Sequence, residues 1–227
     1  MKGRIIYIKG HKESEQQAKD CLNSSRKYNS WQVELKEGIT PDTLEKIPPI
    51  IENSRLLNFK KENENIFLTK ISCVTNHINF WKEVVDLGEP MCFLEHDSIC
   101  ISEIPKIRFN EYLLLNTEYV FKHPSKLAIA RLREYNFPKL KGVNPFPFDY
   151  PLTYYRENIW KGSFMAPGVA AYAVTPRGAE KLLKVADKNI DQADFIVNSN
   201  NIEMEYLYPS VCKFNNKNLS TSHGFQF

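Results

Sequence analysis

The sequence predicts an α/β protein with a central sheet that is mixed but mostly parallel and is flanked by helices. Three observations support this prediction. The chain opens as strand, helix and strand, a long amphipathic helix leads into a buried strand near residue 92, and a second strand–helix pair follows residue 168. Strands that alternate with helices favour parallel pairing, because a parallel pair needs a long crossover connection.

The bulk composition is that of a folded protein without a membrane segment. The chain has 227 residues, enough for one domain over residues 1–227 with a sizeable core, and 42% of them are hydrophobic. The net charge of +3 is too small to indicate a nucleic-acid partner by itself. Five widely spaced cysteines, no visible signal peptide and no apolar run of ~20 residues predict a cytoplasmic protein.

The first third of the chain contains a strand, a helix and a second strand. Residues 4–8 form a compact β-rich run, which predicts a buried first strand. Ser14 and Gln17 match a capping box, which predicts the start of the following helix. Residues 31–35 alternate apolar and polar side chains, as a strand does. The crevice after the first strand is a frequent position for a nucleotide in such sheets.

A long amphipathic helix is predicted over residues 69–87. Its apolar side chains are spaced by three and four residues and therefore share one face: Ile71, Val74, Ile78, Trp81 and Val85. Gly88 and Pro90 end this helix, and residues 91–94 form the next buried strand. The mixed segment 41–67 predicts loops and short helices.

The second half contains fewer regular segments. Residues 113–115 predict a short strand, and residues 136–167, rich in Pro, Phe and Tyr, predict a long loop because they show no periodicity. Residues 169–174 predict another buried strand. Thr175-Pro176 predicts the start of a helix, because Thr is a good cap and Pro suits the first turn. Alternation over residues 204–208 indicates a late strand.

The candidate site lies where the strand 91–94 ends, at Glu95 and Asp97. Acids at positions i and i+2 after a buried strand can turn toward one point, and open α/β sheets bind ligands at that end. Carboxylate oxygens suit Mg²⁺ or Mn²⁺, ions that usually serve a diphosphate. The pair therefore indicates an enzyme acting on a nucleotide-linked substrate. The alternative is two solvated acids in a turn, with His96 between them exposed or packed rather than a metal ligand.

Four further polar residues are candidates for chemistry. His77 lies at the flank of the apolar helix stripe, where a half-buried histidine bonded to backbone is the simpler interpretation. Asp191 and Asp194 each suit a helix N-cap or a general base, which needs a carboxylate aimed at an acceptor hydroxyl. His223, in a polar tail, either has no role or closes over a bound diphosphate.

Four segments in order, spread over nearly the whole chain, resemble glycosyltransferase family 25. This family includes lipooligosaccharide and procollagen galactosyltransferases. The segments are residues 5–8 (IIYI), similar to the family's first strand, 72–82 (SCVTNHINFWK), similar to its GCxxSHxxxWK helix, 93–97 (FLEHD), similar to its LEDD strand end, and 168–183, similar to its GTxAYxISxxGAxxLL block.

The chain departs from the family pattern at several positions. Asn76 stands where the family usually has serine, and Ser72 stands where it usually has glycine. His96 replaces the middle acid of the strand end, although the outer pair is kept. Residues 9–12 lack the Asn-Leu-Asp-Arg continuation of the first strand.

The resemblance implies a GT-A type fold with a Rossmann-like nucleotide-binding core and a UDP-sugar donor. It implies Mn²⁺ or Mg²⁺ at Glu95 and Asp97, with His223 completing the metal site. The reaction that it implies is metal-dependent, inverting transfer of a hexose, galactose or glucose, to a hydroxyl of a glycan or lipid-linked lipooligosaccharide acceptor. Residues 136–167 are then expected on the acceptor side.

Inverting transfer requires one base and no enzyme nucleophile. The resemblance leaves Asp191 and Asp194 as equal candidates for this base. On the donor side it suggests four residues, which are Tyr7, Ile8, Asn76 and His77.

Three rival interpretations remain at the level of sequence. Transfer to a modified base in DNA would need a basic groove, for which the sequence offers Lys139, Lys141, Arg156 and Lys161. A module that binds a sugar nucleotide without turnover would keep the fold and lose the chemistry. A metal-dependent hydrolase at Glu95, His96 and Asp97 would need a second cluster of metal ligands, which the sequence does not show clearly.

Overall fold

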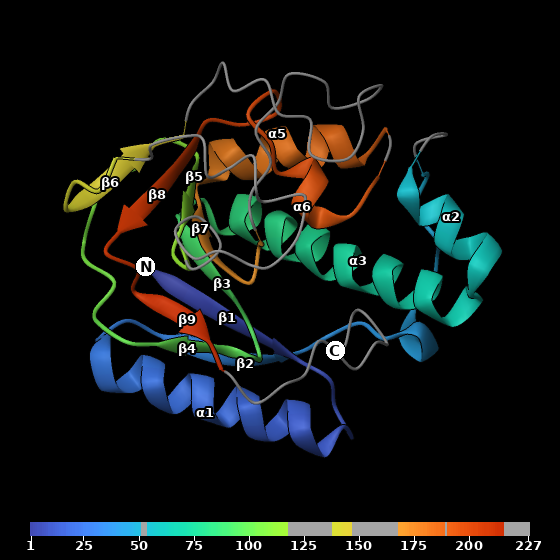
Figure 1. Cartoon of the computed structure of the whole chain (residues 1–227), viewed down its shortest axis with the longest axis horizontal. Helices are drawn as coiled ribbons and strands as arrows, with labels where there is room; N and C mark the ends of the chain where they lie inside the picture. The colour runs from blue at the N-terminus through green and yellow to red at the C-terminus, as the bar shows by residue number, and fades with distance from the viewer. Residues whose placement is uncertain (51–53, 118–137, 147–167, 189, 216–227) are drawn as a thin grey trace.

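The protein is built on a seven-stranded mixed sheet (Figure 1). The computed structural model describes residues 1–50, 54–117, 138–146, 168–188 and 190–215. In spatial order the strands are β2 (Val33–Glu37), β1 (Lys2–Tyr7), β3 (Met91–Glu95), β7 (Ala171–Val174), β5 (Tyr112–Leu114), β8 (Met204–Tyr208) and β6 (Gly142–Pro145). A separate antiparallel pair is formed by β4 (Ser98–Cys100) and β9 (Cys212–Phe214).

The sheet confirms the predicted α/β class. The pairs β2–β1, β1–β3 and β5–β8 are parallel, whereas β3–β7, β7–β5 and β8–β6 are antiparallel. The three strands of the N-terminal half, β2, β1 and β3, are therefore all parallel to one another. This half resembles a Rossmann-like unit, because β1, β2 and β3 point the same way and connect through helices.

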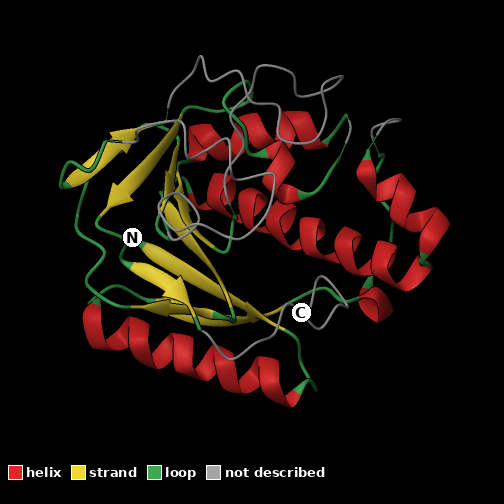
Figure 2. Ribbon diagram, viewed as in Figure 1, coloured by secondary structure: helices red, strands yellow, loops and turns green. Residues whose placement is uncertain are grey.

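Helices cover both faces of the sheet (Figure 2). On one face lie α1 (Lys12–Tyr28) and the β4–β9 pair; on the other lie α3 (Glu64–Leu87), α5 (Pro176–Ala186) and the short α6 (Ala193–Ile196), with η1 (Pro41–Thr43) and α2 (Arg55–Glu62) beside α3. Strand side chains alternate between the two layers. In β3, Cys92 and Leu94 pack toward α1, whereas Met91 and Phe93 pack toward α3.

The start of α1 differs from the predicted capping box. The helix begins at Lys12, and its N-cap is His11, whose Nδ1 accepts a hydrogen bond from the Ser14 amide at 3.2 Å. Ser14 lies inside the first turn, where its hydroxyl accepts a hydrogen bond from the Ile8 amide at 2.8 Å. The capping-box prediction was wrong because the imidazole nitrogen of His11, three residues before Ser14, accepts the hydrogen bond that a capping serine oxygen would accept.

The long helix is confirmed and is longer than predicted. It begins at Glu64, because the Asn63 side chain caps the amide of Ile66, and it ends where Gly88 adopts a left-handed conformation with φ of 66°. Polar residues in its first turn hid this start from the hydrophobic pattern.

The strands predicted in the second half are confirmed: β8 has the predicted bounds, β5 is shifted by one residue, and β7 begins two residues later than predicted. Thr175 caps α5 as predicted, accepting a hydrogen bond from Gly178. The predicted loop over 136–167 was wrong at residues 142–145, which form β6 at the edge of the sheet. Residues 147–167 lie outside the described part of the chain. No helix within the described residues is long and apolar enough to cross a membrane.

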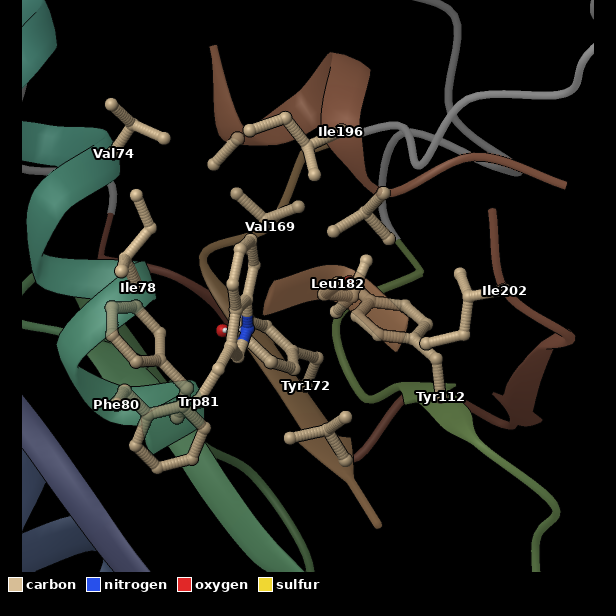
Figure 3. Packing of buried hydrophobic residues seen from close by; sticks show 14 of the residues in the cluster. Val74, Ile78, Phe80, Trp81, Tyr112, Val169, Tyr172, Leu182, Ile196 and Ile202 are labelled. Atoms are coloured by element: carbon tan, nitrogen blue, oxygen red, sulfur yellow. Dashed lines mark hydrogen bonds between the residues drawn. The ribbon is translucent and has the colours of Figure 1, made fainter. Parts of the chain in front are cut away.

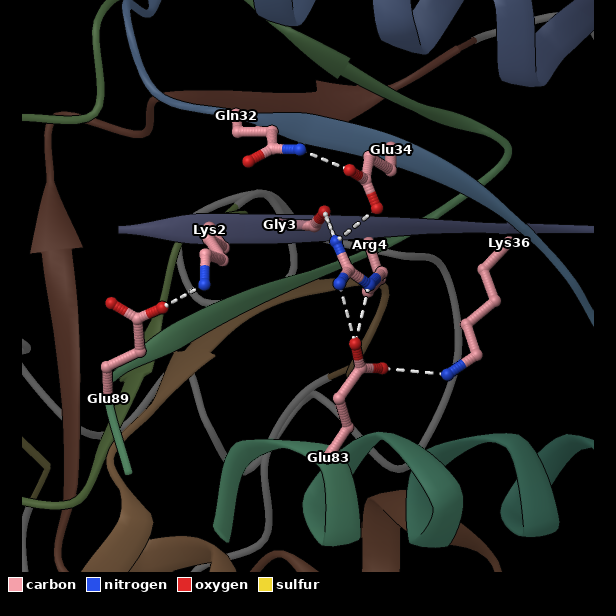
Figure 4. Close-up of polar contacts among 8 residues, drawn as sticks. All are labelled: Lys2, Gly3, Arg4, Gln32, Glu34, Lys36, Glu83 and Glu89. Carbon is pink, nitrogen blue, oxygen red and sulfur yellow. Dashed lines mark hydrogen bonds and ion pairs between the residues drawn. The ribbon is translucent and has the colours of Figure 1, made fainter. Parts of the chain in front are cut away.

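An ion-pair network ties α3 to the parallel edge of the sheet (Figure 4). Glu83 on α3 accepts Arg4 Nε at 2.8 Å and Lys36 Nζ at 2.7 Å. Burial by itself would raise the pKa of Glu83, but hydrogen bonds from Lys36 and Arg4 outweigh it and lower the pKa below its ordinary value. The charged form of Glu83 therefore stabilises the folded state.

We expect Glu83→Gln to lower the free energy of unfolding at pH 7 by about 1–3 kcal/mol, the usual worth of a hydrogen bond to a charged group. The pKa of Glu83 is depressed in the folded state, so the carboxylate's contribution is present above the ordinary Glu pKa and is lost as pH falls through the lower folded pKa. Urea unfolding at pH 7 and pH 3 measures both effects.

The matched control is Glu89→Gln, which removes an exposed pair with Lys2. This control should change the urea midpoint little, because exposed pairs contribute little to stability. Equal effects of the two substitutions would contradict the structural role of Glu83.

Candidate active site

The site is built around the turn that follows β3. Glu95 is the last residue of β3, and the chain turns through His96 and Asp97 into β4. Two backbone hydrogen bonds hold this turn, from the Glu95 amide to the Ala170 carbonyl at 2.7 Å and from the Asn215 amide to the Asp97 carbonyl at 2.6 Å. The turn is therefore anchored to the residue before β7 and to the residue after β9.

Three carboxyl groups share this poorly solvated region. Burial raises the pKa of Glu95 to about 7, and burial together with the Glu95 charge raises the pKa of Asp97 to about 7. Burial and the Glu95 charge also raise the pKa of Asp194, in the first turn of α6, to about 6. Like charges held together in a low-dielectric site favour a bound proton or a bound cation.

His77 is completely enclosed, contrary to the expected half-buried position. Only 1% of it is exposed, and its ring stacks on Phe93 with centroids 4.2 Å apart. Its Nδ1 lies 3.0 Å from the Tyr172 hydroxyl rather than against a backbone group. Burial lowers the pKa of His77 to about 4, so the imidazole is neutral at physiological pH.

His77 also faces the acids. Its Nε2 lies 3.8 Å from Glu95 Oε1, and within the described residues this nitrogen is buried without a hydrogen-bond partner. The ligand atoms of Cys73, His77 and Glu95 lie within 4.8 Å of one another. Burial and the nearby Glu95 charge raise the pKa of the Cys73 thiol far above its ordinary value, which makes this thiol a poor ligand for a hard cation.

Glu95 and Asp97 offer ligand atoms of the type that a hard divalent cation prefers. Asp97 Oδ1 is buried and has no hydrogen-bond partner in the described part of the chain. The Glu95 side chain keeps 31% of its surface exposed, so the site is open to a ligand. Carboxylate oxygens of this kind are what Mg²⁺ and Mn²⁺ prefer. His96 is mostly buried, with 9% exposed, so of the two positions expected for it, exposed or packed, it takes the packed one.

The two candidate bases occupy different environments. Asp191 is fully buried, and its Oδ1 accepts the Ser54 hydroxyl at 2.7 Å and the Gln192 amide at 2.8 Å. Asp194 Oδ1 is buried without a hydrogen-bond partner among the described residues, and its carboxyl group interacts with Glu95 and His77. Neither aspartate is the N-cap of α6, because Gln192 holds that position.

Two of the predicted donor-side residues, Tyr7 and Ile8, lie at the end of β1, and the other two, Asn76 and His77, lie in the middle of α3. Tyr7 ends β1, and the Ile8 amide is held by Ser14. The Asn76 side chain forms two hydrogen bonds with the backbone of Ile39, accepting its amide at 2.7 Å and donating to its carbonyl at 3.0 Å. Asn76 therefore holds the segment after β2 against α3. A cavity of about 720 Å³ lies along this segment and α3, and none of the three acids lines it.

Sequence reasoning assigned no role to two buried residues near the acids. Tyr172 on β7 binds His77 and accepts the Trp81 indole N–H at 3.0 Å, and Figure 3 shows Trp81 and Tyr172 packed together in the core. Lys70 is 5% exposed, and its positive charge acts to lower the pKa of Asp194. The signal for Lys70 was its position on the apolar stripe of α3, three residues after Phe67. His223, Arg156 and Lys161 lie outside the described residues.

The mixed sheet flanked by helices is consistent with a fold of the GT-A class. A family model described as glycosyltransferase family 25 (LPS biosynthesis protein) matches residues 7–197. The chain belongs to this family and is a glycosyltransferase. This confirms the resemblance carried by the ordered motifs. Among curated proteins, no sequence matches the chain.

We expect Asp191→Ala to lower the free energy of unfolding by about 1–3 kcal/mol, because it leaves the buried Ser54 hydroxyl and the Gln192 amide without their acceptor. Ser54 also caps α2, so the loss should loosen that helix. The urea midpoint measures the effect, and Asp187→Ala, at an exposed position, is the control. An unchanged midpoint in Asp191→Ala would contradict a structural role for this carboxylate.

Proposed function

We propose that the protein transfers a hexose, galactose or glucose, from a UDP-sugar to a hydroxyl of a glycan or lipooligosaccharide acceptor. The observation that carries the proposal is the cluster of three carboxyl groups at the end of β3 and in α6, in a chain that belongs to glycosyltransferase family 25. Such a cluster is costly without a counter-charge, and a metal–diphosphate donor supplies one.

Glu95 and Asp97 are the proposed ligands for Mn²⁺ or Mg²⁺, and His223 is a further ligand from the tail. When bound, the ion acts as a Lewis acid that stabilises the charge of the departing diphosphate. Support comes from the buried Asp97 Oδ1, which lacks a partner in the described chain, and from the mutual repulsion of the two carboxylates.

The proposed reaction is a single inverting displacement. The acceptor oxygen forms a bond to the anomeric carbon as the bond from that carbon to the diphosphate oxygen breaks. The nucleoside diphosphate leaves with the bonding electron pair, and the acceptor hydroxyl gives its proton to a carboxylate base. No enzyme nucleophile takes part.

Asp194 is the better candidate for this base. A base must have a free carboxylate oxygen within reach of a hydroxyl and a pKa near the working pH. Asp194 Oδ1 has no hydrogen-bond partner among described residues, and its pKa is raised to about 6. Asp191 is the weaker candidate, since its Oδ1 already accepts two hydrogen bonds.

Tyr7 and Ile8 are proposed to contact the donor nucleoside, because they lie at the carboxyl end of β1 beside β3. Asn76 serves the donor side indirectly, by holding Ile39, and His77 serves it through Glu95. The segment 136–167 is proposed to face the acceptor, and residues 1–227 to act as one domain.

Membership in the family favours this function over the rival interpretations. Neither a module that binds a sugar nucleotide without turnover nor a hydrolase has the glycosyltransferase activity that the family model describes. Transfer to DNA keeps the chemistry and changes the acceptor. The described basic residues of that hypothesis, Lys139 and Lys141, are exposed and lie next to the edge strand β6 rather than at the acid cluster.

A thermal-shift screen of UDP, GDP and UDP-sugars, with and without Mn²⁺, tests the donor. A ligand that binds only the folded state raises the melting temperature by mass action. We expect UDP-sugars to raise it in the presence of Mn²⁺. The proposal would be overturned if no nucleotide shifted the melting temperature under either condition.

We expect Asp97→Asn to lower kcat/KM for sugar transfer by at least about 100-fold, because one charged oxygen ligand for the diphosphate's cation is lost. The rate of UDP release during transfer or hydrolysis of a UDP-hexose measures the effect. Asp86→Asn, at an exposed position on α3, is the matched control. Full activity of Asp97→Asn would rule out the proposed metal site.

We expect Asp194→Asn to lower kcat by about 10²–10⁴-fold, the usual worth of a general base, while UDP binding is retained. Comparing kcat with the UDP-induced thermal shift separates the two effects. Asp187→Asn controls for charge at the end of α5. If Asp194→Asn keeps its kcat while Asp191→Asn loses it, the base is Asp191.

A further inference from the structure

The Tyr172 hydroxyl links the core of the protein to the acid cluster. It has two hydrogen-bond partners in the described part of the chain, Trp81 Nε1 and His77 Nδ1, each at 3.0 Å. All three side chains are at most 1% exposed, so water does not complete their hydrogen bonds. The N–H and O–H protons of these three side chains must therefore find their acceptors among protein groups rather than in water.

The indole of Trp81 decides the direction of the chain. An indole N–H only donates, so the Tyr172 oxygen accepts from Trp81. The hydroxyl proton of Tyr172 then points to the remaining partner, which is His77 Nδ1. A nitrogen that accepts carries no proton, so the imidazole proton of His77 resides on Nε2.

The opposite tautomer is costly. With the proton on Nδ1, both Trp81 and His77 would donate to Tyr172, and the hydroxyl proton would have no acceptor among the described residues. A buried polar group without a partner has given up its hydrogen bonds to water and gains none within the protein, which costs free energy. This tautomer, with the proton on Nδ1, is also the one that His77 would need in order to bind a metal through Nε2, because a metal binds the unprotonated nitrogen.

We infer that Tyr172 fixes His77 as an Nε2–H donor aimed at the Glu95 carboxylate, which makes His77 a positioning residue rather than a metal ligand. This inference rests on the proposed function, in which Glu95 holds the cation. Nε2 lies 3.8 Å from Glu95 Oε1, so a small rotation of the Glu95 side chain, which is partly exposed, completes the hydrogen bond. The order of donors is Trp81, Tyr172, His77 and Glu95.

The chain offers a matched control at the same depth. Tyr112 stacks on Tyr172 with ring centroids 4.9 Å apart, and it is equally buried. Its hydroxyl has no hydrogen-bond partner among described residues. Tyr112→Phe therefore removes the same group from the same aromatic stack without touching the donor chain, whereas Tyr172→Phe removes the link itself.

Long-range proton–nitrogen NMR of the full chain labelled with ¹⁵N-histidine reads the tautomer directly. The His77 signals are assigned by their absence in His77→Gln. We expect a protonated Nε2 and an unprotonated Nδ1 in the native protein and in Tyr112→Phe, and a loss of this preference in Tyr172→Phe. A protonated Nδ1 with an unprotonated Nε2 in the native protein would overturn the inference and favour Cys73, His77 and Glu95 as metal ligands.

Binding of Mn²⁺, measured by the electron paramagnetic resonance signal of the free ion with and without UDP, tests the consequence for Glu95. Loss of a group that orients a metal ligand typically weakens metal binding by about 10–100-fold. We expect a weakening of this size in Tyr172→Phe and none in Tyr112→Phe, with thermal unfolding confirming that both variants are folded.

The outcomes separate this inference from the proposed function. If the native protein binds Mn²⁺ and Tyr172→Phe binds it equally well, the positioning role is wrong while the metal site stands. If the native protein binds no Mn²⁺ with or without UDP, the metal site of the proposed function is wrong and His77 positions no ligand. The NMR result still decides the tautomer in that case.

Discussion

The burial of β3 between two helical layers is the constraint on which the candidate site depends. Its side chains alternate between the layer of α1 and the layer of α3, so the strand is held on both faces until Glu95. Parallel pairing with β1 and antiparallel pairing with β7 complete its backbone hydrogen bonds. The acids that follow leave the strand at a defined point because everything before them is fixed.

The aromatic cluster on the α3 side connects this constraint to the chemistry. Three aromatic rings stack across three neighbouring strands. The ring centroid of Tyr172 lies 5.2 Å from that of Phe93 and 4.9 Å from that of Tyr112. His77 joins the stack from α3 and brings a polar nitrogen to its edge. Packing of apolar rings and orientation of a polar donor are therefore achieved by the same residues, and a change in one alters the other.

The acid cluster carries a cost that a function explains. Three carboxyl groups with raised pKa values lie together where the sheet is poorly solvated, and Lys70 is the buried cation whose charge reaches Asp194. The carboxylates of Asp191 and Glu83 are arranged differently, since each accepts two hydrogen bonds or more from donors on other residues. Several carboxyl groups with raised pKa values in one poorly solvated region are typical of a functional site.

The sequence by itself determined the fold class, most of the elements and the position of Glu95 and Asp97 at the end of a buried strand. These follow from local patterns, namely helical spacing on α3, alternation in strands, and turn residues such as Gly88. Motif order was enough to place the chain in its family. The edge strand β6 was missed because its partner β8 lies about sixty residues further on. The start of α1 was missed although its cap is local, because a histidine rather than a serine accepts the hydrogen bond of the first turn.

Only the tertiary structure decided which polar residues meet. Asp191 and Asp194 look alike in the sequence, but one bonds Ser54, 137 residues away, and the other faces Glu95. The direction of the donor chain through Tyr172 and His77 depends on side chains 91 and 95 residues apart. Hydrogen-bond partners across such distances are set by how the sheet and helices pack, so no periodicity or spacing along the chain records them.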